Sequence, residues 1–415
     1  MIKTVMWIGG WTASLVLAFF VGRDLGSPQA QPASFVPADM GLASRNALGQ
    51  GSPMARLGQS AQVLQHLNAE NLEEVLAVYE MMLSGLGDCD LRIFSDAWAQ
   101  FDRRGAFDHA MGWEWSHKRV VGSDAAIRSW AIRDPIEAAA ALPDIVAENS
   151  RIQSRIVDNF LVGWAHSGQP GLDEYIAGIK TQAPEKYVAQ VLNAILRRGG
   201  PEAVHAWSDG ILQDEDYSYG MKRAAFRTGL RTSARWDPEL SAEWVAPYLE
   251  EEWADDGPRI MADQWGKHDG LAAMEWVRTL PEGPSRQSAT RAAFVSWMKN
   301  DEPAAEAWLL AQALSPFHDP ALNYYARELA KTDSIRSLAL CEQVRDEKRR
   351  IGCLKKAAKN WYRVDAVAAE GWLQESPLDE ETRSQVRRAD QRTEAKEGAG
   401  AQRAKRPGGP PSRRR

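Results

Sequence analysis

Tryptophan and aspartate residues recur along the chain at a fixed spacing, and both residue types can do chemistry. The segments WGKHDGLAAMEW, WMKNDEPAAEAW and WYRVDAVAAEGW begin at Trp265, Trp297 and Trp361, and each places an aspartate between two tryptophans. A row of aspartates could bind calcium or act in acid–base catalysis, and exposed indole rings could stack on sugars. The arrangement of the whole repeat decides between these sites and a structural role.

The spacing favours a structural role for both residue types. Aspartates stand every 32 residues from Asp237 to Asp365. Metal binding needs several ligands that converge on one point, whereas equivalent residues of stacked repeats lie in a row, one repeat apart. We therefore predict that the aspartates cap helices and that the tryptophans form a repeated core. The predicted repeat residues are Trp98, Trp130, Trp164, Trp207, Trp244, Trp265, Trp276, Trp297, Trp308, Trp361 and Trp372, with Asp102, Asp134, Asp237, Asp269, Asp301, Asp333 and Asp365.

Two helices joined by a short turn account for each repeat. Before the turn, apolar residues such as Phe294 and Trp297 recur at helical spacing. The aspartate then fits the N-cap of the second helix, where its carboxylate accepts unpaired backbone N–H groups. One such hairpin cannot bury its apolar face alone, so neighbouring hairpins must stack. We predict an all-α fold, a right-handed α-solenoid of about nine or ten helix-turn-helix repeats over residues 60–388, preceded by one transmembrane helix.

The segment DEPAAEAWLLAQAL, which begins at Asp301, resembles the second helix of tetratricopeptide-type α-solenoids. In that family an acidic or glycine-containing turn precedes a small residue, a large aromatic residue and a closing Ala-Leu. The period of 32 residues differs from the family's 34, and the family's first-helix signature W-x2-L-G-x2-Y is not found in the sequence. The resemblance implies a superhelical scaffold whose inner surface binds peptides or proteins.

The two ends of the chain differ in composition from its centre. After the short end at residues 1–4, the uncharged apolar residues 5–22 predict a transmembrane signal-anchor helix, with a cleaved signal peptide as the alternative. Lys3 and Arg23 favour a single-pass membrane protein whose bulk is periplasmic or extracytoplasmic. Residues 23–59, rich in Gly, Pro and Ser, predict a flexible linker, and the basic residues 389–415 predict a disordered tail.

Histidine, cysteine and glycine patterns provide little support for catalysis. The seven histidines form no HExxH motif, and no glycine-rich phosphate loop follows a credible strand. The sequence therefore predicts no catalytic residue, no metal ligand and no cofactor. Cys341 and Cys353 flank a predicted turn, so they could form a disulfide or remain small core residues, whereas Cys89 has no evident partner.

Trp113 and Trp115 lie outside the repeat register. We therefore regard them as candidates for surface contact, with packing against a capping repeat as the alternative.

These features together predict a membrane-tethered, non-catalytic scaffold that binds a protein or peptide partner, with the membrane contacted through the N-terminal helix. One alternative is an α/α-toroid enzyme or binding protein that acts on polysaccharide, which would need acidic or aromatic residues unique to one or two repeats. A second alternative is a module that associates with an anionic polymer or nucleic acid through the basic tail. Near-uniform repetition argues against the first, and nucleic acid is not the expected partner.

Overall fold

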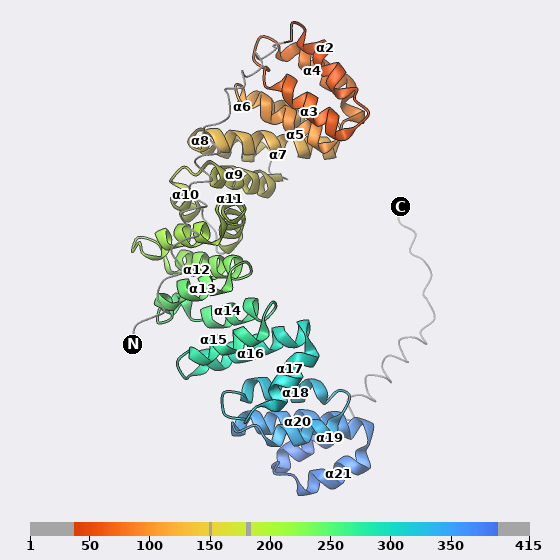
Figure 1. The fold of residues 1–415 in the computed structure, drawn as a ribbon, viewed down its shortest axis with the longest axis vertical. Coiled ribbons are helices and arrows are strands. Elements are labelled where there is room, and N and C mark those ends of the chain that lie inside the picture. The colour runs from red at the N-terminus through yellow and green to blue at the C-terminus, as the bar shows by residue number, and fades with distance from the viewer. Residues whose placement is uncertain (1–36, 149–151, 180–183, 389–415) are drawn as a thin grey trace, which may run out of the picture. The chain divides into compact units, whose positions relative to one another are not determined.

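The computed structural model describes residues 37–148, 152–179 and 184–388, and in these ranges the chain is helical throughout, without strands (Figure 1). Consecutive helices pack against their neighbours, as in helical-repeat proteins. Contacts divide the chain into two compact units, Met1–Ser167 and Gly168–Arg415. The described residues of each unit build their own core.

The first unit alternates helices that pack on one another with shorter helices that cover them. Within it, α5 contacts α7 and α7 contacts α9, while α6 and α8 pack on the same helices. Tyr79 and Phe94 stack in its core with ring centroids 4.1 Å apart, and both side chains are almost fully buried. Its helices are α2 (Met40–Leu48), α3 (Pro53–Leu64), α4 (Leu72–Met82), α5 (Asp88–Trp98), α6 (Arg103–Gly112), α7 (Ser116–Arg133), α8 (Pro135–Glu148) and α9 (Gln153–Ser167), with a 3-10 turn at Leu83–Gly85.

The second unit repeats the same arrangement more regularly. We call α12, α14, α16, α18 and α20, which precede a turn aspartate, the first helices, and α13, α15, α17, α19 and α21 the second helices. Each first helix contacts the next first helix, and the second helices pack beside them. The bounds are α10 (Leu172–Gly178), α11 (Glu185–Leu212), α12 (Tyr219–Ser233), α13 (Pro238–Val245), α14 (Gly257–Trp265), α15 (Gly270–Thr279), α16 (Pro284–Asn300), α17 (Glu302–Ala311), α18 (Asp319–Leu329), α19 (Ser334–Glu342), α20 (Glu347–Val364) and α21 (Ala366–Glu375), with 3-10 turns at Ala246–Tyr248 and Glu252–Ala254.

The turn between first and second helix has one geometry at seven aspartates. The backbone N–H of each aspartate donates to the carbonyl four residues earlier, and its carboxylate accepts from the backbone N–H three residues later at 2.9–3.1 Å. One residue therefore ends the first helix and caps the second. The seven are Asp102, Asp134, Asp237, Asp269, Asp301, Asp333 and Asp365.

Helix α11 contains the same junction with glycine in place of aspartate. Gly200 has φ of 73° and ψ of −172°, which interrupts the helix, and Pro201 begins its second part. Positive φ is strained for residues with a Cβ, so glycine suits this position. The long helix is thus a first and a second helix of one repeat.

We expect Asp301→Ala to lower the free energy of unfolding by about 1 kcal/mol, because the N–H of Ala304 loses its acceptor. Asp301→Asn keeps an oxygen acceptor and should lose less. Urea unfolding followed by circular dichroism measures both. No loss in Asp301→Ala would show that the cap contributes nothing measurable, and equal losses in the two variants would show that an amide oxygen does not replace the carboxylate.

Helical structure begins earlier than predicted. The predicted linker, residues 23–59, contains α2 and the start of α3, so its later part is helical in the structure. Asp39 caps α2 by accepting the N–H of Leu42 at 2.6 Å, and Pro53 occupies the first position of α3. Proline and aspartate, read as linker residues, act as helix starts here. The predicted segments 1–4 and 389–415 and the earlier part of the linker lie outside the described residues.

The predicted transmembrane helix at residues 5–22 also lies outside the described residues. In the ranges that the structure describes, no helix has both the length and the apolar composition needed to cross a membrane. The longer helices, such as α7 and α20, carry charged residues along their length, which disfavours insertion into a bilayer. This finding contradicts the predicted fold class in its transmembrane part and the predicted single-pass membrane localisation. The fold class is corrected to an all-helical fold without a membrane-spanning helix in the described ranges. These ranges likewise give no support to the predicted single-pass membrane localisation.

Candidate interaction surface

The repeated tryptophans occupy two different environments. Those before the aspartate are mostly buried, with Trp130 and Trp164 each 3% exposed. Those after the aspartate are mostly half-buried. Trp308, for example, packs against Trp297 with ring centroids 5.6 Å apart. The buried members are Trp98, Trp130, Trp164, Trp244, Trp265 and Trp297, and the half-buried ones are Trp207, Trp276, Trp308, Trp361 and Trp372.

The two tryptophans outside the register differ from one another. Trp113 is only 6% exposed, so it packs in the interior and does not offer the predicted surface contact. Its ring lies against Gly122 of α7, where a Cβ would come within 2.4 Å of it, and edge-on to His109. A glycine nine residues away, in the next helix, opens the space for this ring. Trp115, by contrast, is 56% exposed.

The repeated aspartates do not converge. Each one lies at its own turn and is engaged with the backbone of the following helix. Among the described residues, no group of three or more acidic, histidine or cysteine side chains could hold a metal ion. The aspartates therefore serve the turns.

His318 has a buried ring beside Trp308, and only one of its two ring nitrogens has a hydrogen-bond partner. The backbone N–H of Ser315 donates to Nδ1 at 3.1 Å, so Nδ1 is an acceptor and the neutral ring carries its proton on Nε2. Nε2 is buried without a partner, and the ring faces Trp308 at 5.7 Å. Burial, and then the positive charge of Arg278, hold the pKa of His318 below its ordinary value.

We expect a pH-dependent loss of stability from this histidine. Its folded-state pKa lies below the unfolded value of about 6.5, so the unfolded chain binds the proton more readily. Stability is therefore unaffected above that value and falls as the pH drops from it to the folded-state pKa. The His318→Asn variant keeps an acceptor for Ser315 and should lose less stability between pH 7 and pH 5 in parallel urea titrations. The same pH slope in both proteins would contradict this origin.

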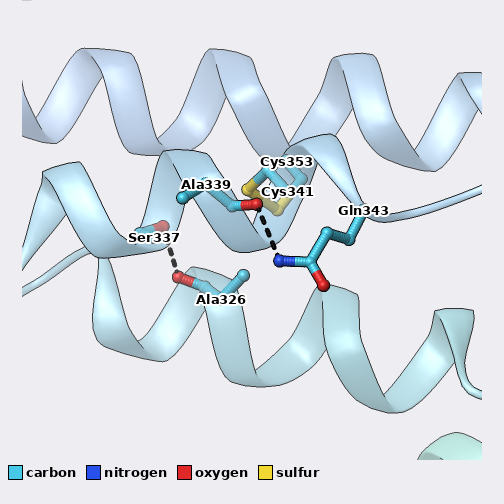
Figure 2. Close-up of a disulfide and its surroundings, with 6 residues drawn as sticks. All are labelled: Ala326, Ser337, Ala339, Cys341, Gln343 and Cys353. Carbon is cyan, nitrogen blue, oxygen red and sulfur yellow. Dashed lines mark hydrogen bonds between the residues drawn. A yellow bond between two sulfur atoms is a disulfide. The ribbon is translucent and has the colours of Figure 1, made fainter. Parts of the chain in front are cut away.

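Cys341 and Cys353 form a disulfide that joins α19 to α20, with Cα atoms 5.5 Å apart (Figure 2). On the other side of α19, the hydroxyl of Ser337 donates to the carbonyl of Ala326 in α18 at 2.6 Å. Helix α19 is thus tied to both of the first helices between which it packs. Cys89 is an exposed free thiol.

A hollow of about 380 Å³ opens at the first helices α18 and α20. We call it the basic hollow. Its lining is Asn323 and Arg327 from α18, with Asp346, Lys348, Arg349 and Gly352 at the start of α20.

The charges of the basic hollow do not cancel. Asp346 caps α20 by accepting the N–H of Arg349 at 2.7 Å, and its carboxylate lies 3.9 Å from the guanidinium of the same arginine. Arg349 also donates to Gln287 of α16 at 2.7 Å. Arg327 and Lys348 form no ion pair with any residue in the described ranges. Two uncompensated cations therefore face this hollow.

One residue of the hollow, Asn323, stands in a longer row on the first helices. The position ten residues before each turn aspartate of the second unit recurs at 32-residue spacing. It is occupied by Arg227, Arg259, Arg291, Asn323 and Lys355. The earlier cations of this row are partly offset, since Arg227 and Arg259 share the one carboxylate of Asp256, at 3.1 and 3.0 Å.

Comparison with known proteins adds no relative. No protein-family model matches the chain, and no curated protein or solved structure matches it significantly.

Proposed function

We propose that this chain is a non-catalytic helical-repeat scaffold, similar in style to tetratricopeptide-type α-solenoids, that binds a protein or peptide partner on its first helices. The observation that carries this proposal is the basic hollow, because its cations Arg327 and Lys348 have no partner among the described residues. Cations that line a hollow without ion pairs favour a ligand of opposite charge.

The repeated turns support the same proposal. Capping aspartates and packed indoles hold the first helices at regular intervals, and stacked repeats of this kind create extended binding surfaces. The residues that recur serve the core and the turns, which leaves the exposed positions of the first helices free to vary with the partner.

Site-specific photo-cross-linking in the native cell tests the proposal with the full chain. A photoreactive residue replaces Gly352 of the hollow on α20, where an added Cβ meets nothing within 4 Å, in one variant and Leu310 on α17, which is 45% exposed, in the control. We expect a discrete protein adduct from position 352 and none from position 310. Equal adducts at both positions, or none at 352, would contradict binding on the first helices.

A further inference from the structure

We infer that the basic hollow is a binding site for a small phosphate ester in its dianionic form. The inference goes beyond the proposed function, because it assigns the hollow a small ligand in addition to a protein partner. The unpaired charge of the hollow, its polar lining and the open space at Gly352 favour such a ligand.

The two unpaired cations reach the hollow from neighbouring helices. Arg327 stands on α18 and Lys348 on α20, two helices that pack against one another (Figure 1), and both side chains are exposed. Neither forms an ion pair within the part of the chain that the structure describes. A phosphate monoester has a charge close to −2 and three acceptor oxygens, whereas a carboxylate has one charge and two oxygens. The dianion therefore matches both cations, and its third oxygen allows contacts from both helices.

The remaining charges of the lining largely offset one another. Arg349 lies 3.9 Å from the carboxylate of Asp346, and it also donates to Gln287 of α16 at 2.7 Å. The net charge of the lining is thus that of Arg327 and Lys348. Guanidinium groups contact phosphate through two parallel hydrogen bonds, and an ammonium group acts as a point charge. We therefore assign the directional contact to Arg327 and the second charge to Lys348.

The lining of the hollow fits a small and polar ligand. The described residues that line it are all polar or charged apart from Gly352. Its volume of about 380 Å³ lies in the range of small-molecule sites. A ligand held there must gain its affinity from charge and hydrogen bonds, because the lining offers little apolar surface.

Gly352 leaves room for the ligand beside the two cations. It lies four residues after Lys348 within α20, and an added Cβ would meet no heavy atom of the described chain within 4 Å. Glycine is unfavourable inside a helix relative to alanine, and no close neighbour requires it here. A longer side chain at this position would occupy part of the hollow.

Phosphorus-31 NMR of phenyl phosphate with the full chain tests the inference at about pH 8, where the ester is a dianion. We expect its resonance to broaden on addition of the protein, and a titration gives the dissociation constant. Arg327→Ala and Lys348→Ala should each weaken binding about tenfold, because each removes a contact to a charged group. Lys299→Ala, which alters an exposed lysine near the end of α16, should leave the affinity within about twofold.

A matched pair of variants at Gly352 tests the place of binding without removing either cation. Gly352→Glu puts a carboxylate one helical turn after Lys348, where it can pair with that lysine, and should weaken binding at least about tenfold. Gly352→Gln adds a side chain of the same size without the charge and should weaken it less. Both variants should fold, since the added Cβ meets no neighbour.

Three results would overturn the inference. Phenyl sulfate has a similar shape and a single negative charge, so equal affinity for it would show that the dianion is not recognised. Unchanged affinity in Gly352→Glu would place the bound phosphate outside the hollow. Absence of phosphate binding, while the photoreactive residue at position 352 still captures a protein, would remove the phosphate site and leave the scaffold function standing.

Discussion

Trp297→Ala is expected to lower the free energy of unfolding by about 3–5 kcal/mol. The ring is 8% exposed and fills the space over Gly270, where even a Cβ would come within 2.0 Å of it. It also supports Trp308 at 5.6 Å, so its removal leaves a cavity between two repeats. Urea unfolding monitored by circular dichroism gives the change.

Trp236→Ala is the matched control, because this indole is 69% exposed. Surface substitutions of this kind change stability by about 0.5 kcal/mol or less. Similar losses in Trp236→Ala and Trp297→Ala would show that the repeated tryptophan is not the element that holds neighbouring hairpins together.

Loss of the disulfide is expected to have the second largest effect. Cys341 and Cys353 are 12 residues apart in sequence, and closure of a loop of this size stabilises a protein by about 3 kcal/mol in the chain-entropy account. The double variant Cys341→Ser, Cys353→Ser should therefore unfold at lower urea concentration than the oxidised protein. Reduction of the unaltered chain should produce most of the same shift.

Cys89→Ser provides the control for the disulfide variants, since Cys89 is an exposed free thiol. It should match the parent protein with and without reductant. If the oxidised and reduced forms of the parent unfold at the same urea concentration, the bond does not stabilise this end of the chain.

The turns were the part of the fold that could be predicted best. The role of an aspartate between two tryptophans can be predicted from the sequence, because helix capping depends on residues only a few positions away. The all-helical repeat follows from that pattern and is present in the structure. The beginning of the fold could not be read as easily, since Asp39 and Pro53 have the composition of a linker and the geometry of helix starts.

Residues that depend on distant neighbours were harder to predict. Trp113 is buried because Gly122 leaves room for its ring, which no local pattern reveals. The basic hollow joins residues of α18 and α20 that lie in different repeats. Arg227, Arg259, Arg291 and Lys355 share a register position that the sequence shows, but none of them lines the hollow. The pairing of Arg227 and Arg259 with Asp256 also follows only from the structure.

The double use of each turn aspartate constrains how the chain can change in length. A residue inserted between Trp297 and Asp301 would break the bond from the aspartate N–H to the tryptophan carbonyl and rotate the whole second helix by about 100°. We therefore expect insertions to be tolerated only between one hairpin and the next. The five additional residues that separate Gly200 from Asp237, beyond the usual 32, fall outside the turns, and α11 and α12 keep their register on either side. Insertions and deletions in this chain should therefore change the path between repeats and leave each repeat intact.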